Sequence, residues 1–364
     1  MTYAGDQSVF SNIEPGLVSG LTTEAVEWKR SYGRTSRQVY VECEFQQWSG
    51  AQVSSGTSVQ GQPVFHTYWT DVMDIDQYRQ GVKEDIINWL AMLRKTSSNT
   101  DWMIVLVETP EGRKGNKFPL RATVLDKLKQ DVGGKTPERC VSLTDPSKAD
   151  SRAAESMQSF LHKFRQLFLQ SYNKVLNKFE ENIRSQREKR NEPSWNFCQY
   201  FLLQEQLAFV YESLGLFDEA LIQYDELDAL FTQFILNSSV GDSPSWLESF
   251  NKDLSDWSPL TLDVNKNMKL RTKLEQKCPS LMDMRNYLFS RQCHQLLLSQ
   301  KTNDVAARTI SFLHNTAQEL DILEVKEMVD GSLDCWVLLA CLEVVQTCDK
   351  SSTDDSGTNF VIVW

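Results

Sequence analysis

The chain has 364 residues, of which 41% are hydrophobic and 24% are charged, so it is long enough for about two folded domains with cores of their own. Its formal net charge of −11 offers no basic surface of the kind that binds nucleic acid through phosphates. These values exclude a disordered chain and argue against a nucleic-acid partner.

The sequence contains no pattern that predicts a membrane helix or secretion. No apolar run reaches the ~18 residues that a membrane helix needs, and MTYAGDQSVF lacks the basic start and apolar stretch of a signal peptide. The eight cysteines stand at irregular spacings without a C-x-x-C pair, which favours reduced, buried thiols. We therefore expect a cytosolic protein.

The first part of the chain opens with a short strand, TYAGD (2–6), and an irregular helix, SVFSNIEPGLVSGL (8–21). Two further strands are predicted for VYVECEF (39–45) and VFHTYW (64–69), separated by a polar loop rich in Gly and Ser. Because no helix separates these two strands, we expect them to pair antiparallel as a hairpin with a long connection.

Helices and strands then alternate. The spacing predicts a helix over 76–94, a strand over 101–109, a helix over 119–130 and a strand over 140–146. Six consecutive apolar residues, 102–107, are typical of a strand buried on both faces of a parallel sheet. This alternation predicts an α/β domain over residues 1–150.

The motif GGKT (133–136) resembles the second half of a phosphate-binding loop, G-x-x-x-x-G-K-[ST]. Lys129 stands where the first Gly of that loop would be, and the preceding residues predict a helix rather than a strand. We interpret the motif as a helix end with Gly at the C′ position.

The order of predicted elements is also that of small Ras-like GTPases. The phosphate loop of such a fold would lie in GDQSVFS (5–11), where Gly5 is followed by no second Gly and no Lys. The metal-binding D-x-x-G would fall near DVMD (71–74), which lacks its Gly, and ETPEG (108–112) replaces the base-reading N-K-x-D. We therefore predict a degenerate, GTPase-like α/β domain without a phosphate-binding loop.

From Ala154 the pattern predicts helices only. An apolar stripe from Met157 to Ile183 predicts one long helix, which ends in the basic run REKRNEP (187–193). The basic run suits the negative end of the helix dipole, or alternatively a contact for an acidic partner or an anionic membrane.

The segment 206–231 is close to a tetratricopeptide pattern, in which small residues let paired helices approach and aromatic residues fill the space between them. Its matching positions are Ala208, Tyr211, Gly215, Phe217, Ala220 and Tyr224. With further helices predicted at 268–299, 303–325 and 332–347, residues 151–347 are predicted to form a TPR-like α-solenoid, followed by a flexible tail over 348–364.

Candidate chemistry is sparse. The chain has four histidines, at positions 66, 162, 294 and 314. Cys293 and His294 are adjacent, but neighbours on a helix point about 100° apart and no third ligand stands three or four positions away, so core packing is favoured over a thiol or metal site. We expect no catalytic residue, no cofactor and no metal.

One acidic group remains as a candidate contact. Asp225, Glu226 and Asp228 lie beside Tyr224 on a predicted helix. They form either a solvated helix face or an interface for a partner protein.

Several segments together resemble the subunit 10 family of the trafficking protein particle (TRAPP) complex, in its N-terminal part. They are AGDQSVF, VEWKRSYGR, EKRNEPSWNFCQYF, LAFVYESLGLFDEALIQYDELDALF, YLFSRQC and LDCWVLLACLEV, and the similarity runs from about residue 4 to residue 346. The chain differs from the family in about its last dozen residues, and family members are longer.

This resemblance implies a non-catalytic scaffold or tethering subunit of the type II TRAPP complex, an exchange factor assembly for Rab GTPases in vesicle traffic at the Golgi. It implies other TRAPP subunits as partners, a Rab GTPase and a membrane surface reached only through the assembled complex, and a location in the cytoplasm and peripherally at the Golgi. No catalytic residue carries over. The alternatives are a nucleotide-binding Ras-like regulatory protein and a hydrolase that uses Cys293 and His294.

Overall fold

The computed structural model describes residues 1–30, 35–50, 63–96, 101–109, 122–146, 151–241, 243–253, 257–326 and 330–353. The chain divides into two units, Met1–Phe179 and Glu180–Trp364, and each is described by itself. Parallel strands and covering helices build the first, and helices build the second. The combination of an α/β part and an all-helical part is confirmed.

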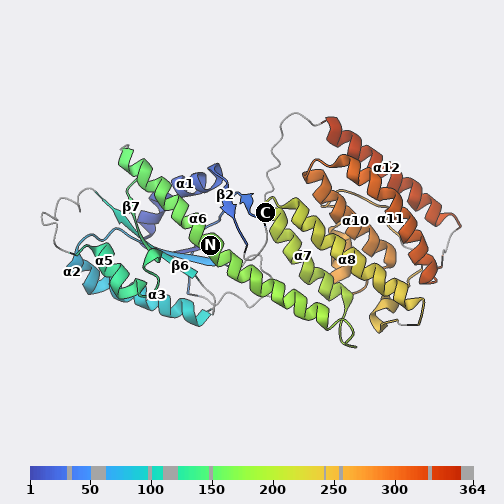
Figure 1. Ribbon diagram of the computed structural model, residues 1–364, viewed down its shortest axis with the longest axis horizontal. Coiled ribbons are helices and arrows are strands. Elements are labelled where there is room, and N and C mark those ends of the chain that lie inside the picture. The colour runs from blue at the N-terminus through green and yellow to red at the C-terminus, as the bar shows by residue number, and fades with distance from the viewer. Residues whose placement is uncertain are drawn as a thin grey trace. The chain divides into compact units, whose positions relative to one another are not determined.

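A five-stranded parallel sheet forms the centre of the first unit (Figure 1). Its order is β4-β1-β5-β6-β7, and every neighbouring pair runs in the same direction. The strands are β1 (Thr2–Gly5), β4 (Gln46–Gln47), β5 (Phe65–Thr70), β6 (Asp101–Glu108) and β7 (Cys140–Thr144). In β6 the run from Met103 to Val107 is buried, as expected of a strand covered on both faces.

The predicted antiparallel hairpin is wrong. Both edges of β5 are occupied, because β1 and β6 pair with it in parallel. The strand predicted over 39–45 is also wrong in extent: β3 (Arg37–Val39) pairs antiparallel with β2 (Val26–Trp28), and the chain then crosses to β4 at the sheet edge. Phe45 is half-buried in this crossing and packs on the core, since its ring lies 5.4 Å from that of Phe10.

Helices cover both faces of the sheet. Figure 1 shows α1 (Gln7–Thr23) and α6 (Ser151–Glu188) on one face, with α3 (Lys83–Thr96) and α5 (Val124–Leu128) on the other. The side chains of β5 alternate between these layers: the ring of Trp69 lies 5.4 Å from that of Phe10 in α1, and the ring of Tyr68 lies 5.3 Å from that of Trp89 in α3. Because successive side chains of a strand point to opposite faces, β5 contributes to two separate cores, one on each face of the sheet.

Two irregular turns modify the predicted helices. The helix predicted over 76–94 is built from α2 (Ile75–Gln77), a wider turn η1 (Tyr78–Val82) and α3. The helix predicted over 119–130 begins at Val124 in the described chain, where Thr123 and Asp126 form a capping box, and continues through η2 (Lys129–Gly133). Pro119 lies outside the described residues.

The GGKT motif ends a helix, as predicted. Gly134 has φ +48°, a conformation that favours glycine, and its N–H donates to Lys129 O at 3.1 Å. The short turn η3 (Pro137–Arg139) then leads directly into β7.

The long helix α6 belongs to both units. Its apolar stripe packs on the sheet, where the rings of Phe160 and Phe164 lie 5.9 Å from Trp69 and 5.7 Å from Phe65. Because of this packing the first unit extends through Phe179, beyond the boundary at residue 150 that the sequence suggests.

The second unit holds six further helices among its described residues. They are α7 (Phe197–Ser213), α8 (Phe217–Ser238), α9 (Met268–Glu275), α10 (Leu281–Leu298), α11 (Thr302–Ile322) and α12 (Ser332–Thr353), with the single 3-10 segment η4 (Ser245–Phe250). Helices α7 and α8 form an antiparallel pair around Gly215, whose φ is +69°, and the small residues Ala208 and Ala220 are fully buried.

Two helix boundaries differ from the prediction. The helix expected over 268–299 is broken into α9 and α10, because Lys277 adopts φ +55° and Pro279 follows it. Helix α12 continues to Thr353, so the flexible tail predicted from residue 348 does not begin there. Residues 354–364 lie outside the described part.

Candidate functional site: an occupied switch point and a buried ion-pair network

The carboxyl ends of β1 and β5 meet where an open parallel sheet usually binds a ligand. In this sheet the chain leaves β1 toward the edge strand β4 and returns on the other side of β1 at β5. The place where the strand order reverses in this way is called the switch point, and ligands of α/β sheets bind outside the strand ends there. A helix N-terminus located there offers free N–H groups to phosphate. The residues at the two strand ends are Gly5 and Asp6 on one side and Thr70 and Asp71 on the other.

Asp6 occupies this position with its own carboxylate. Its Oδ1 accepts hydrogen bonds from Ser8 N at 2.9 Å, from Val9 N at 3.1 Å and from Ser8 Oγ at 2.6 Å. The hydroxyl of Ser8, followed by the Val9 amide, lowers the pKa of Asp6, so the carboxylate is charged at neutral pH. A phosphate would have to displace this carboxylate or lie against its negative charge.

Gly5 brings β1 and β5 into close contact at the same place. The Asp6 N–H donates to Trp69 O at 2.9 Å, and a Cβ added to Gly5 would lie 2.2 Å from that oxygen. Gly5 also has φ +87°, which L side chains rarely adopt. The contact between the strands therefore requires a glycine at position 5, and this requirement does not involve a phosphate.

The segment 71–74 also serves as a helix cap. Asp74, in the segment where a metal-binding D-x-x-G was sought, caps α2 by accepting from Asp76 N and Gln77 N, each at 2.9 Å. Residues 110–112 of ETPEG lie outside the described residues. Across the part of the chain that is described, His, Cys, Asp and Glu side chains form no group of three that could hold a metal ion.

His66 lies near the amino end of β5, and it is a core residue. Its Nδ1 lies 2.6 Å from Thr2 Oγ1, and its ring meets that of Trp48 edge-on at 5.5 Å. Burial, together with the N-terminal ammonium, lowers the pKa of His66 to about 4. A base with this pKa is neutral at pH 7 and poorly matched to proton transfer there.

The buried His66 makes stability depend on pH. Since its folded pKa is depressed below the usual 6.5, the unfolded chain binds a proton more tightly between these values, and stability falls as the pH is lowered from 6.5 toward 4. Between pH 6.5 and pH 5 we expect a loss of about 2 kcal/mol. Urea unfolding at pH 7 and pH 5 measures this loss. His66→Gln should remove about that amount of the pH dependence, and an equal dependence in both proteins would contradict the assignment.

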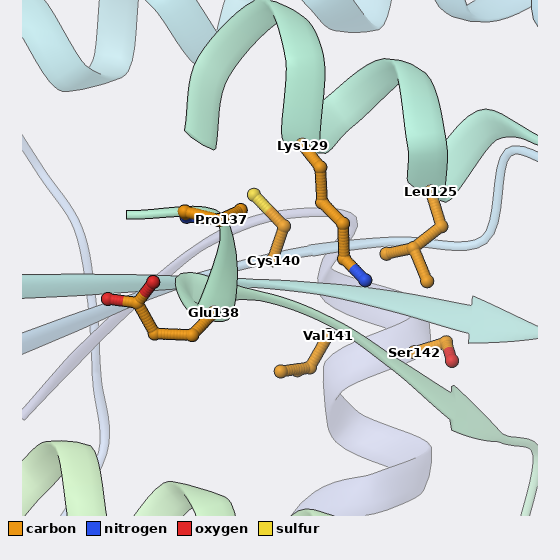
Figure 2. Close-up of a pocket in the computed structure, with 7 residues that line it drawn as sticks. All are labelled: Leu125, Lys129, Pro137, Glu138, Cys140, Val141 and Ser142. Carbon is orange, nitrogen blue, oxygen red and sulfur yellow. The ribbon is translucent and has the colours of Figure 1, made fainter. Parts of the chain in front are cut away.

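A shallow hollow lies along the edge strand β7. Figure 2 shows its lining side chains, which come from β7, from η3 and from the helical turns above them: Leu125, Lys129, Pro137, Glu138, Cys140, Val141 and Ser142. Burial raises the pKa of the Cys140 thiol to about 11, so this sulfur is a protonated, weak nucleophile.

The outer edge of β7 is partly covered. Thr144 N donates to Ser156 Oγ of α6 at 2.9 Å, and the following Asp145 N donates to Glu108 O of β6 at 3.2 Å. Since main-chain groups alternate along a strand, those of Ser142 point toward the outer edge, as those of Thr144 do. The hollow therefore presents main-chain hydrogen-bonding groups that a partner could contact. It does not present an acid–base pair for catalysis.

The predicted acidic group in the second unit is half-exposed around a buried tyrosine. Tyr224 is fully buried, and Arg291 Nε donates to its hydroxyl at 2.9 Å. Asp225 pairs with Arg308 at 2.7 Å, and Asp228 pairs with Arg285. Tyr224 is therefore a core residue in this structure, and two of the three carboxylates hold helices together.

Glu226 is the most accessible member of this group. Its side chain is 46% exposed, lies 3.5 Å from Arg187 and accepts a hydrogen bond from Gln204 Nε2 at 3.1 Å. The basic run at the end of α6 thus has an acidic contact within its own unit.

Two arginines of the buried network, Arg285 and Arg291, come from α10, which is buried over most of its length. Arg291 Nη2 donates to Glu212 of α7 at 2.5 Å, and Glu212 also accepts from Gln295 Nε2 at 2.5 Å. Arg285 donates to Glu319 of α11 through Nε at 2.5 Å. One buried helix therefore fixes α7, α8 and α11 by charge.

Glu205 completes this network. It is fully buried, accepts from Tyr287 Oη at 2.5 Å and from Arg271 Nε at 3.0 Å, and burial raises its pKa against the opposing effect of Arg271 and Arg291. Each of these buried acids meets at least one arginine, which is the arrangement of a structural network rather than of a catalytic acid.

Cys293 and His294 do not form a pair. Cys293 is fully buried and burial raises its pKa well above the usual range, while His294 Nε2 lies 3.5 Å from Glu212 Oε1. The thiol is packed in an apolar cluster with Phe289 and Leu296. This arrangement fits the core packing that the sequence favoured.

Local sequence patterns indicate some of these features. An Asp directly before a helix is a capping signal, so Asp6 could have been identified as a cap. Arg291 of YLFSRQC stands among large apolar residues, which indicates a buried charge, but nothing in the local pattern says which acid it meets.

No described helix is long and apolar enough to cross a membrane. Residues 1–190 match the family described as "Trafficking protein particle complex subunit 10-like, N-terminal". No solved structure matches the chain.

Relatives named as complex subunits are similar over three quarters or more of the chain. The "Trafficking protein particle complex subunit 10" of Homo sapiens is 42% identical over 372 residues, covering 100% of this chain and 29% of the relative. The protein of that name from Drosophila melanogaster is 37% identical, covering 99% and 32%. A "Trafficking protein particle complex II-specific subunit 130 homolog" of Arabidopsis thaliana is 26% identical, covering 75% and 20%. The chain thus spans about a third or less of these relatives.

Proposed function

The chain belongs to the family of trafficking protein particle complex subunit 10-like proteins, and from this membership we propose that it is a non-catalytic scaffold subunit of a TRAPP assembly. The observation that carries the proposal is the switch point of the sheet, where Asp6 takes the helix N–H groups that a nucleotide phosphate would need. Without such a site the α/β unit serves as a binding surface for other subunits.

The finer features of the proposal follow from the family. The α/β unit is a GTPase-like fold that has lost its nucleotide site, and the helical unit is a TPR-like α-solenoid that offers long surfaces to other subunits. The assembly is of the type II class, promotes nucleotide exchange on Rab GTPases and works in vesicle traffic at the Golgi. The chain reaches a Rab GTPase or a membrane only through the assembled complex.

Within the helical unit we keep Glu226 as the acidic residue for a partner contact. Its carboxylate is the most accessible of the group formed by Tyr224, Asp225, Glu226 and Asp228. Tyr224 is buried, and Asp225 and Asp228 are each paired with an arginine.

Affinity purification of the tagged chain from cells, with identification of the proteins that accompany it, tests membership of the assembly. We expect other trafficking protein particle complex subunits in the eluate. A full-length relative purified in parallel is the matched control. If the relative brings down those subunits and this chain does not, the scaffold proposal is wrong for this chain.

A further inference from the structure

The outer edge of strand β7 leaves main-chain hydrogen-bonding groups open. Main-chain groups alternate along a strand, so those of Cys140 and Ser142 point to the outer edge, as those of Thr144 do. The Thr144 N–H already donates to Ser156 Oγ, and the Cys140 N–H donates to Pro137 O. Among the described residues, the Ser142 N–H and the carbonyls of Cys140 and Ser142 have no hydrogen-bond partner. These three groups are called the open β7 edge below.

Strand β7 is the longer of the two edge strands of the sheet. It has five residues, Cys140–Thr144, whereas β4 at the other edge spans only Gln46–Gln47. Unpaired main-chain groups on an edge strand are a template for another extended chain. An antiparallel strand at one edge of an otherwise parallel sheet is common in α/β proteins. The open β7 edge therefore fits the main chain of an extended segment.

The hollow beside this edge provides room for such a segment. Its volume is about 390 Å³, and Ser142 lines it together with the helical residue Lys129. Figure 2 shows the Lys129 side chain extending from the helical turn toward β7, whereas the carboxylate of Glu138 lies at the opposite end of the hollow. On an added strand, the side chain directly opposite Ser142 lies on the same face of the sheet, beside Lys129.

The charge of Lys129 is available to that side chain. The Lys129 ammonium has no ion-pair or hydrogen-bond partner among the described residues, unlike two lysines close to it. Lys83 pairs with Asp131 at 3.0 Å, and Lys127 donates to Gln130 Oε1 at 2.9 Å. A carboxylate on the added segment would form a charge-assisted hydrogen bond with Lys129.

We propose that the open β7 edge binds an extended segment of a partner protein as an antiparallel sixth strand, with an acidic residue opposite Ser142. The main chain of this acidic residue exchanges two hydrogen bonds with Ser142, and its carboxylate meets Lys129. The residue two positions after it donates its N–H to Cys140 O. The inference is independent of the proposed function, because an isolated peptide supplies the same groups.

A second copy of the chain fits this edge poorly. If two β7 strands paired antiparallel about Ser142, both copies of Lys129 would lie on the same face of the joined sheet, next to the two-fold axis. Like charges at that place repel each other. The unpaired lysine thus favours an acidic segment of a different protein.

Fluorescence anisotropy of a labelled peptide with the whole chain tests the hydrogen bonds. The probe Thr-Val-Thr-Glu-Thr-Val-Thr has one acidic residue on the face that meets Lys129, and we expect a Kd of about 100 µM or tighter. N-methylation of the glutamate removes the N–H that donates to Ser142 O and should weaken binding by about tenfold or more. N-methylation of the threonine that follows it is the matched control, because that N–H points away from β7.

A matched pair of variants tests the charge. Lys129→Gln should weaken binding of the glutamate peptide by about threefold, and it should not change the affinity for the same peptide with glutamine in place of glutamate. Lys127→Gln removes the same charge two positions away and should leave both affinities unchanged.

Four results would overturn the inference. They are the absence of saturable binding, equal effects of the two N-methyl groups, equal effects of the two lysine variants, and a dimer of the chain that the peptide dissociates. The last result would assign the open β7 edge to a second copy.

Discussion

Arg291→Met is expected to lower the free energy of unfolding by about 3–5 kcal/mol, because it removes one partner of a buried ion pair and leaves the other charge uncompensated. Arg291 is buried, donates to Glu212 at 2.5 Å and to Tyr224 at 2.9 Å, and lies with its guanidinium 4.9 Å from the ring of Phe209. Chemical denaturation followed by circular dichroism measures the loss.

Two further variants make this prediction specific. Arg184→Met changes an exposed arginine of α6 and should cost less than about 0.5 kcal/mol. Adding Glu212→Gln to Arg291→Met removes the stranded carboxylate, so the double variant should be more stable than the sum of the single losses implies. If Arg291→Met costs no more than the exposed control, the network does not hold the helices together.

Gly5→Ala is expected to destabilise the α/β unit by roughly 2–6 kcal/mol, from the combined cost of an unfavourable backbone conformation and of a steric clash. The added Cβ would lie 2.2 Å from Trp69 O, a main-chain atom of the central strand β5 that cannot turn away. Thermal unfolding of the variant measures the effect.

Gly134→Ala separates the two contributions. Gly134 also has a positive φ, +48°, but an added Cβ would meet nothing within 4 Å. This variant should therefore cost only about 1 kcal/mol, the conformational part alone. Equal losses at Gly5 and Gly134 would show that the close contact between β1 and β5 is unimportant.

The elements of the fold that depend on local pattern could be predicted from the sequence. The apolar run of β6 and the long stripe of α6 each belong to one segment of chain, and both lie where the periodicity places them. The pairing of β5 could not be derived in this way, because it depends on β1 and β6, which are distant along the chain.

The acidic group of α8 shows the same limit at the level of single side chains. Local pattern places Asp225 and Asp228 on a polar helix face, and only the packed structure brings Arg308 and Arg285 to them. A polar face toward solvent and a polar face toward a buried polar helix give the same sequence pattern.

Helix α12 presents the converse case. Its two apolar rows, at 336, 340 and 344 and at 335, 338, 342 and 345, are both visible in the sequence. The sequence does not say which row the protein's own core covers, and the structure assigns that role to the row of Trp336.

Equilibrium binding of fluorescent GDP and GTP analogues to the whole chain, with Mg²⁺ and with a Ras-like GTPase as positive control, tests the central claim most directly. Because Asp6 satisfies the N–H groups at the start of α1, we predict no saturable binding up to about 100 µM nucleotide. Saturable, Mg²⁺-dependent binding in the micromolar range or tighter would contradict the claim and identify the α/β unit as a nucleotide-binding regulator.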